Sequence, residues 1–511
     1  MTNVSHKRVA KNTLLLYCRL LLTVGVSLFT VRIVLGTLGV EDYGVYNVVG
    51  GLVALLAFLP AAMASATQRF FSFALGAKDE ERLRTTFSVN FALYSAIAIT
   101  ALLLLETAGA WYVREHLRLP ADRLDGALAL YHFSVLTFTA SIFTSPFMAI
   151  IIAHEDMKIY AYVSIVEAVL KLTVAYLLTH LAGDKLSLYG SLLLGVAIFN
   201  ASLYIGICTR KYSECQFRIF HWNKSLLREI LGFTGWTLFG QLTTAVRNHA
   251  VTILLNQMFN PTVVAARAIA VQVGAQTNLF SANFNTSLYP PIVKSYAAGR
   301  TNEMYSLILN GCKITFFLMW ILALPLLLEM EAVLTLWLKN PPADSVLYAR
   351  LALVETLITS VSLPLMTAAR ASGKMRLYEL TLGAMQLTIL PLAWSALKAS
   401  QAPWTVFAVA IAVNALMFVV RLFIVNHLVG LPAKAFLRQV GLSISAVVCV
   451  SSAFSLGVAS LLPNGLLYSA TAAFASLCVS GVCIYFWGLN AEWREKLRAA
   501  ILKKTSSWRK A

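Results

Sequence analysis

Long apolar segments dominate this chain, and most of them could cross a lipid bilayer. Only 13% of the 511 residues are charged, about half the share usual in a soluble domain. A helix of about twenty apolar residues spans the hydrocarbon core of a membrane. The apolar runs predict fourteen helical spans at residues 12–37, 43–66, 86–109, 126–153, 158–182, 187–209, 230–257, 262–287, 304–328, 346–371, 376–398, 403–427, 437–461 and 466–488. We therefore expect an all-α polytopic membrane protein.

Lysine and arginine residues indicate how these spans are oriented. With the N-terminus placed inside, 27 of the 41 Lys and Arg residues fall in or beside inside segments. Only 6 fall in outside loops, and the other 8 lie within the spans. Cytoplasmic loops are the ones enriched in Lys and Arg. The sequence thus predicts that both termini are cytoplasmic, and that the basic tail at 490–511 lies on anionic lipid.

An internal repeat divides the chain. The segment SFALGAKDEE at 72–81 resembles SYAAGRTNEM at 295–304, an offset of 223 residues. Further on, SPFMAIIIAHEDMKIY at 145–160 resembles LPLMTAARASGKMRLY at 363–378, an offset of 218. When the sequence is shifted by these offsets, each predicted span of the first half aligns with the span that comes six places later. Six helices per unit preserve membrane direction, which predicts two parallel repeats around a central cavity.

The repeat sets the expected domain boundaries. An N-lobe of six helices is predicted at 1–209, and a basic cytoplasmic linker at 210–229. A C-lobe of six helices is predicted at 230–427, followed by two further helices at 428–489.

The sequence carries no pattern that points to an enzyme. No loop is long enough for a folded catalytic domain, and no phosphate-binding glycine loop, zinc-protease motif or hydrolase triad is evident. The seven cysteines form no CxxC pair, and all but Cys215 fall inside apolar segments. We expect no disulfide framework, metal site or cofactor.

The N-terminal region resembles a known family of transporters. Its residues are KNTLLLYCRLLLTVGVSLFTVRIVLGTLGVEDYGVYNVVGG at 11–51, followed by SATQRFFSFALG at 65–76. They are similar to bacterial polysaccharide transporters, the Wzx-like O-antigen flippases of the multidrug/oligosaccharidyl-lipid/polysaccharide (MOP) superfamily. The resemblance is sharpest over residues 7–90, and a layout of 6+6+2 helices fits this branch.

This resemblance implies a function in the bacterial inner membrane. It implies that an undecaprenyl-diphosphate-linked oligosaccharide, such as an O-antigen, capsule or exopolysaccharide unit, is flipped from the cytoplasmic to the periplasmic leaflet. Membrane lipid, a coupling proton or sodium ion, and polysaccharide-assembly proteins are the expected partners, and nucleic acid is not.

Such a substrate needs a polar, cationic cavity within the membrane, because charged groups are costly in hydrocarbon. Polar stripes at helical spacing occur in three predicted spans. The candidate substrate-binding residues are Arg19, Thr23, Gln241, Arg247, Asn248, Arg267, Gln272 and Lys313. For each uncharged member, hydrogen bonding between helices is the competing interpretation. For Arg267, which is near a helix end, snorkelling to the membrane surface competes.

Three charged residues are candidates for ion coupling. Glu167 and Lys171 are separated by four residues near the middle of one span, and Glu355 is another acid within a span. A carboxylate that exchanges a proton or cation would couple transport to a gradient. The alternative interpretation is that Glu167 and Lys171 merely neutralise each other.

Other functions stay open at this stage. A lipid II-type flippase or a multidrug/cation antiporter of the same superfamily would share the fold. The antiporter would favour an acidic cavity, whereas here basic residues outnumber acidic residues within the spans. A membrane glycosyltransferase or polymerase would need acidic catalytic loops, and the outside loops hold only scattered acids.

Overall fold

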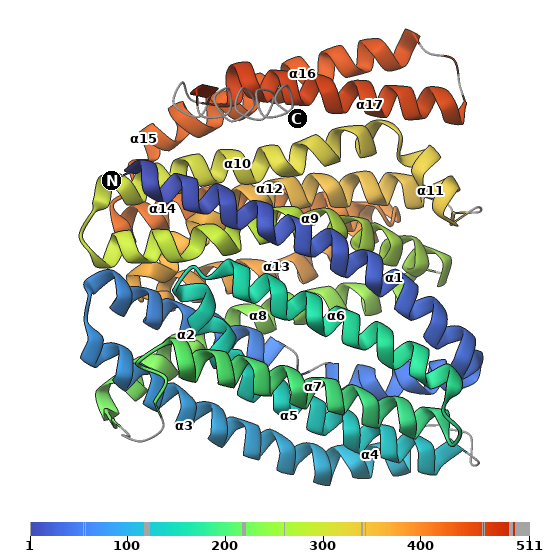
Figure 1. Ribbon diagram of the computed structural model, residues 1–511. Coiled ribbons are helices and arrows are strands. Elements are labelled where there is room, and N and C mark those ends of the chain that lie inside the picture. The colour runs from blue at the N-terminus through green and yellow to red at the C-terminus, as the bar shows by residue number, and fades with distance from the viewer. Residues whose placement is uncertain are drawn as a thin grey trace, which may run out of the picture. The chain divides into compact units, whose positions relative to one another are not determined.

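The computed structural model describes residues 2–54, 56, 58–116, 123–216, 221–259, 261–338, 341–342, 344–461, 463, 465–489 and 494–495. All regular elements in these ranges are helices (Figure 1), which confirms the predicted all-α class. The predicted basic tail at 490–511 lies outside the described residues, apart from 494–495.

Twelve of the fourteen predicted spans are confirmed as helices that are long and apolar enough to cross a membrane. The other two predicted spans correspond to α8 (Lys224–Met258) and α9 (Pro261–Ala297). With 35 and 37 residues, both are long enough to span a bilayer, but neither is among the twelve. These two helices carry five of the eight candidate substrate-binding residues, namely Gln241, Arg247, Asn248, Arg267 and Gln272.

The helices form two compact units. Unit 1 comprises residues 1–242 and 286–301, and unit 2 comprises residues 243–285 and 302–511. The division passes through α8 after Leu242 and through α9 after Asn285, whereas the repeat places the boundary in the 210–229 linker. The lobe boundaries derived from the repeat stay a prediction.

Unit 1 is built around α5, which packs against α1, α2, α3 and α7. Its largest fully buried side chains include Tyr131, Ile142 and Phe147 on α5. A short π-helical segment, η1, continues α3, and its first carbonyl accepts a hydrogen bond of 2.6 Å from the Tyr131 hydroxyl. The elements are α1 (Thr2–Ala54), α2 (Phe58–Ala77), α3 (Glu80–Leu104), η1 (Leu105–Gly109), α4 (Ala110–His116), α5 (Leu124–Ala153), α6 (Met157–His180) and α7 (Lys185–Lys211).

The GVEDYG turn separates the first two predicted spans within one helix assignment. α1 is interrupted by non-helical backbone at Gly39. The buried Asp42 that follows forms a 3.1 Å ion pair with Arg123, which also approaches Asp184 at 3.5 Å. Asp184 caps α7 through the backbone N–H of Ser187. One arginine therefore fixes the turn of α1 against the starts of α5 and α7.

Unit 2 contains the helices from α10 onward. α12 packs closely against α14, and α13 against α14. The indole N–H of Trp320 on α10 donates a 2.9 Å hydrogen bond to Ser451, which attaches the two additional C-terminal helices. The elements are α10 (Thr301–Leu328), α11 (Met330–Leu338), α12 (Ser345–Ser372), α13 (Met375–Ser400), α14 (Thr405–Val429), α15 (Ala433–Phe436), η3 (Leu437–Gly441), α16 (Leu442–Leu461), α17 (Leu466–Cys483) and η4 (Ile484–Gly488).

The backbone supports the predicted offset of 218 residues. Pro146 and Pro364 are buried inside α5 and α12, the helices that the offset matches. After these helices, Glu155 has a φ of 65° and Gly373 a φ of 76°. The same left-handed turn thus occurs at equivalent positions. Glu155 tolerates this unfavourable backbone where its carboxylate forms a 2.7 Å ion pair with Lys294.

The two copies of the shorter repeated segment meet inside unit 1. Gly76 of the first copy lies against the end of α9, beside the second copy. A Cβ atom at Gly76 would be 2.6 Å from both the Cα and the carbonyl oxygen of Lys294, and 2.9 Å from the Ala297 Cβ. Only glycine allows the backbones of α2 and α9 to approach this closely.

Candidate functional site

A cavity of about 350 Å³ lies within unit 2. Four helices contribute most of its wall: α8, α9, α12 and α14. Its apolar lining includes side chains such as Val251, Val271 and Phe407. The polar and charged lining residues are Thr244, Arg247, Asn248, Arg267, Asn278, Glu355, Thr356 and Thr359.

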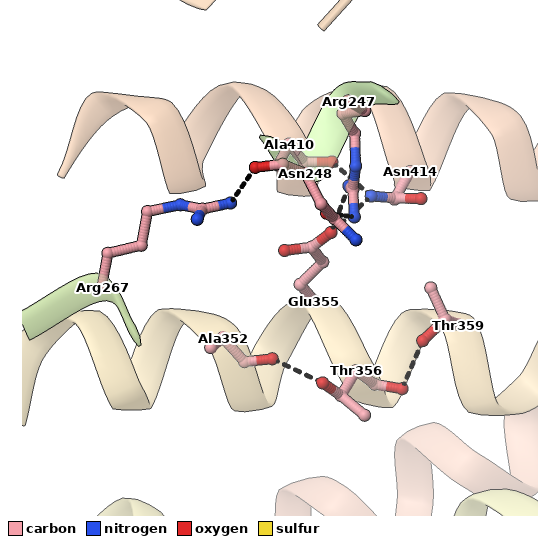
Figure 2. A network of polar contacts seen from close by, with 9 residues as sticks. All are labelled: Arg247, Asn248, Arg267, Ala352, Glu355, Thr356, Thr359, Ala410 and Asn414. Atoms are coloured by element: carbon pink, nitrogen blue, oxygen red, sulfur yellow. Dashed lines mark hydrogen bonds and ion pairs between the residues drawn. The ribbon is translucent and has the colours of Figure 1, made fainter. Parts of the chain in front are cut away.

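An ion pair joins two of the helices that form the wall of this cavity. Arg247 Nη1 on α8 lies 2.8 Å from Glu355 Oε1 on α12 (Figure 2). The same carboxylate oxygen accepts a 3.0 Å hydrogen bond from the amide of Asn414 on α14. Arg247 Nη2 donates to the side-chain oxygen of Asn248 at 2.9 Å. Both charged side chains are mostly buried, with exposed fractions of 15% and 19%.

Arg267, on α9, has only neutral partners. Its Nη1 donates a 2.6 Å hydrogen bond to the Thr252 hydroxyl. Its Nη2 donates at 3.5 Å to the carbonyl of Asn248 (Figure 2). Within the described ranges, no carboxylate lies within ion-pair distance of Arg267. The cavity therefore has two guanidinium groups and one carboxylate, a formal net charge of +1.

The threonines of the cavity wall are tied to their own helix. The hydroxyl of Thr356 donates to the carbonyl of Ala352 at 2.7 Å, and that of Thr359 donates to the carbonyl of Thr356 at 2.9 Å (Figure 2). In membrane helices, hydroxyl groups commonly donate a hydrogen bond to a backbone carbonyl of their own helix in this way. These threonines make the wall polar. The groups that can form directed hydrogen bonds to a ligand are the two arginines, Asn248 and Glu355.

The cavity gathers only part of the set predicted from sequence. It brings together Arg247, Asn248, Arg267 and the coupling candidate Glu355. Gln272, in contrast, is exposed on α9 outside the lining, and Lys313 is buried in α10 without contributing to it. For these two residues the structure shows no place in this cavity.

Three other candidates belong to unit 1. Gln241 lies in the part of α8 that belongs to this unit. The Thr23 hydroxyl donates to the carbonyl of Leu20 at 3.1 Å, as expected for a hydroxyl satisfied within its own helix. The guanidinium carbon of Arg19 lies 4.7 Å from the ring centroid of Tyr160, a cation–π contact. Substrate contact by these three residues stays a prediction.

The predicted pair of Glu167 and Lys171 is present in α6. Lys171 Nζ lies 2.6 Å from Glu167 Oε1, and the amide of Asn200 on α7 donates to the other oxygen at 3.0 Å. Lys171 is about half exposed. This geometry fits a self-neutralising pair, and ion coupling by Glu167 stays a prediction.

Two polar contacts were missed from the sequence. Asn414 is the partner of Glu355, and a lone asparagine inside the apolar run TVFAVAIAVNALMFVV could have signalled it. Arg69, inside the SATQRF segment, is 4% exposed and pairs with Glu229 at 3.2 Å. Its guanidinium lies within 4.6 to 5.6 Å of the rings of Phe70, Phe73 and Phe233, and the flanking phenylalanines could have indicated this aromatic cage.

A second polar cluster joins the α5–α6 turn to the end of α7, outside the spans. His154 Nε2 lies 2.6 Å from Glu214 Oε1, and its ring stacks on Tyr212. The Tyr212 hydroxyl donates to Asp156 at 2.6 Å, and Lys211 pairs with the same carboxylate at 2.9 Å. Burial opposes ionisation of Asp156, but the bonds from Lys211 and Tyr212 outweigh it and lower its pKa. The hydrogen bond from His154 likewise outweighs burial and lowers the pKa of Glu214.

These lowered pKa values predict how stability depends on pH. A carboxylate with a depressed folded-state pKa stabilises the fold above its unfolded pKa, and this contribution is lost as the pH falls through the folded value. The ordinary pKa values are 3.8 for Asp156 and 4.5 for Glu214. Wild type should therefore melt higher than Asp156→Asn/Glu214→Gln at pH 7, and the difference should shrink progressively as the pH falls below 4.5. The measurement is thermal unfolding in detergent, with the exposed Glu80→Gln as control; a difference that stays constant as the pH is lowered would contradict this assignment.

Comparison with known proteins identifies the fold. Residues 19–177 match the MatE family model. A structure described as MATE in the bent conformation is 13% identical with a TM-score of 0.74, covering 84% of this chain and 97% of that one. The outward-facing conformation of a multidrug resistance MATE family transporter of the MOP superfamily is 13% identical with a TM-score of 0.71, covering 83% and 96%. No curated protein matches. The chain has the fold of MATE transporters.

A further structural relative is described by the polarity of its binding pocket. It is a MOP superfamily transporter from Pyrococcus furiosus, 13% identical with a TM-score of 0.67, covering 84% of this chain and 96% of that one. Its description states that reversed polarity of the binding pocket suggests a different function for that protein.

Proposed function

We propose that this protein is a MATE-type membrane transporter and that the unit 2 cavity binds the anionic part of its substrate. The observation that carries the proposal is the charge of the cavity, in which Arg247 is paired with Glu355 while Arg267 has only neutral partners. A guanidinium in a site of low water content stays charged and presents several donors to oxygen atoms. Phosphate oxygens are its best-matched ligands.

The substrate that we propose is an undecaprenyl-diphosphate-linked oligosaccharide, moved from the cytoplasmic to the periplasmic leaflet of the bacterial inner membrane. The sequence resemblance to Wzx-like flippases and the basic cavity support this substrate. The lysine and arginine distribution supports cytoplasmic termini. Lipid, a coupling proton or sodium ion, and polysaccharide-assembly proteins are the partners that this proposal implies.

A multidrug/cation antiporter is the second candidate function. The comparisons favour it over oligosaccharide flipping, because the structural relatives include a multidrug resistance transporter. In that case Glu355 would be the group that binds a cationic drug or a coupling ion. The charge of the cavity favours an anion, and the two candidates therefore predict opposite substrate charges.

Transport into proteoliposomes should separate these candidates. A farnesyl-diphosphate-linked disaccharide is the anionic probe, and ethidium is the cationic probe. Wild type should move the anionic probe, and Arg267→Met should reduce this about ten- to a hundredfold, the value of one charge-assisted contact. Arg267→Lys should retain part of the activity, since it keeps the charge.

The control is Arg32→Ala, which alters an exposed side chain on α1 and should leave transport unchanged. Exchange of ethidium that requires Glu355, together with no movement of the diphosphate probe, would establish the antiporter instead.

A further inference from the structure

We propose that Glu355 is an internal counter-ion that occupies Arg247 while the cavity is empty, so that a ligand contacts Arg247 only through a second negative charge that displaces this carboxylate. The inference rests on the proposed function, because it assumes that the cavity binds an anion. It assigns the two arginines different tasks: Arg267 accepts any anion, and Arg247 becomes available only to a ligand that displaces Glu355.

The first observation is that the contact between Arg247 and Glu355 is one-sided. Arg247 Nη1 and Asn414 Nδ2 both donate to Oε1 of the carboxylate. Arginine and carboxylate commonly form two parallel hydrogen bonds, which is their strongest arrangement. Here a single oxygen takes both donors, so the pair lacks the second parallel hydrogen bond of the strongest arrangement.

The second observation is an unsatisfied donor on the same arginine. Arg247 Nε is buried and has no hydrogen-bond partner among the described residues. Buried donors are nearly always paired in folded proteins. A phosphate that displaced Glu355 could take this N–H together with a terminal nitrogen, a paired geometry that the carboxylate does not use.

The third observation is the contrast with Arg267. Its hydrogen-bond partners are a hydroxyl and a backbone carbonyl, so no carboxylate is bonded to it in the described residues. A ligand with one negative charge can bind there without disturbing the ion pair. A second negative charge on the same ligand can compete with Glu355 for Arg247, and a diphosphate carries that second charge.

Binding of two small sulfonates tests this assignment without interference from ligand titration. Methanesulfonate carries one negative charge and methanedisulfonate two, and calorimetry on the purified protein gives both affinities. Wild type should bind the disulfonate at least tenfold more tightly. Glu355→Gln should raise the affinity for methanesulfonate about ten- to a hundredfold, because Arg247 is released. The affinity for the disulfonate should rise as well, because this ligand no longer has to displace a carboxylate.

The charge-matched variant is Arg247→Met/Glu355→Gln, which restores the net charge of +1 with Arg267 alone. It should bind methanesulfonate as weakly as wild type and lose the preference for the disulfonate. Glu106→Gln removes a carboxylate from unit 1 and should change neither affinity. Should Glu355→Gln fail to fold, Glu355→Asp keeps the charge but withdraws it from Arg247, and should give a smaller gain in the same direction.

The outcomes separate this inference from the function on which it rests. Unchanged or weaker methanesulfonate binding by Glu355→Gln, with binding still dependent on Arg267, would overturn the counter-ion assignment and leave the anion site intact. Absence of any Arg267-dependent binding in wild type would overturn the anion site itself, and the inference with it.

Discussion

Arg247→Met should destabilise the protein much more than Arg267→Met, although both variants remove one guanidinium from the same cavity. Without Arg247, the mostly buried Glu355 keeps only the amide of Asn414 as a partner. Removing one member of a buried ion pair costs about 3–5 kcal/mol, because the other charge is left without compensation. Loss of Arg267 leaves only a hydroxyl and a carbonyl, which water in the cavity can satisfy.

Unfolding of the purified variants in detergent measures this difference. Arg247→Met/Glu355→Gln should recover most of the lost stability, because no charge is then stranded. Arg267→Met should melt close to wild type while losing transport. Equal destabilisation by the two single variants would show that Arg247 and Glu355 do not stabilise each other. The 2.8 Å contact would then contribute little to the free energy of unfolding.

A second large effect is expected at Gly76. In Gly76→Ala, the new methyl group would meet the backbone of Lys294 at 2.6 Å, and a backbone cannot rotate away as a side chain can. Overpacking usually costs about 1–3 kcal/mol, and a contact with backbone belongs at the upper end. Folded yield and melting temperature should therefore fall sharply.

Gly206 on α7 provides the matched control. A Cβ there would meet nothing within 4 Å, so Gly206→Ala should be neutral or stabilise the helix by up to about 1 kcal/mol. If Gly76→Ala is as stable as Gly206→Ala, then α2 and the end of α9 do not pack as closely as described.

The helices themselves could be predicted, because each is encoded by its own run of residues. The turn at GVEDYG, the paired prolines and the polar stripes of α8 and α9 are all local features. The left-handed turn shared by Glu155 and Gly373 also follows from matching two stretches of sequence.

The partners within the cavity could not be predicted in this way. Arg247 and Glu355 are 108 residues apart, and helical periodicity shows which residues share one helix face but not which helices are neighbours. Arg267 is near the start of α9, and for such a position the sequence alone does not separate substrate binding from snorkelling of the side chain to the membrane surface. Gln272 shares a helix with Arg267 and yet lies outside the cavity lining, since five positions along a helix change the face.

The passage of α8 and α9 through both compact units has a mechanical consequence. Each helix is continuous where the division falls, after Leu242 in α8 and after Asn285 in α9. A continuous helix resists bending more than a loop does, because its backbone hydrogen bonds must be distorted. Arg247 is only five residues beyond Leu242, little more than one helical turn. A bend of α8 after Leu242 would therefore move the side chain that holds Glu355.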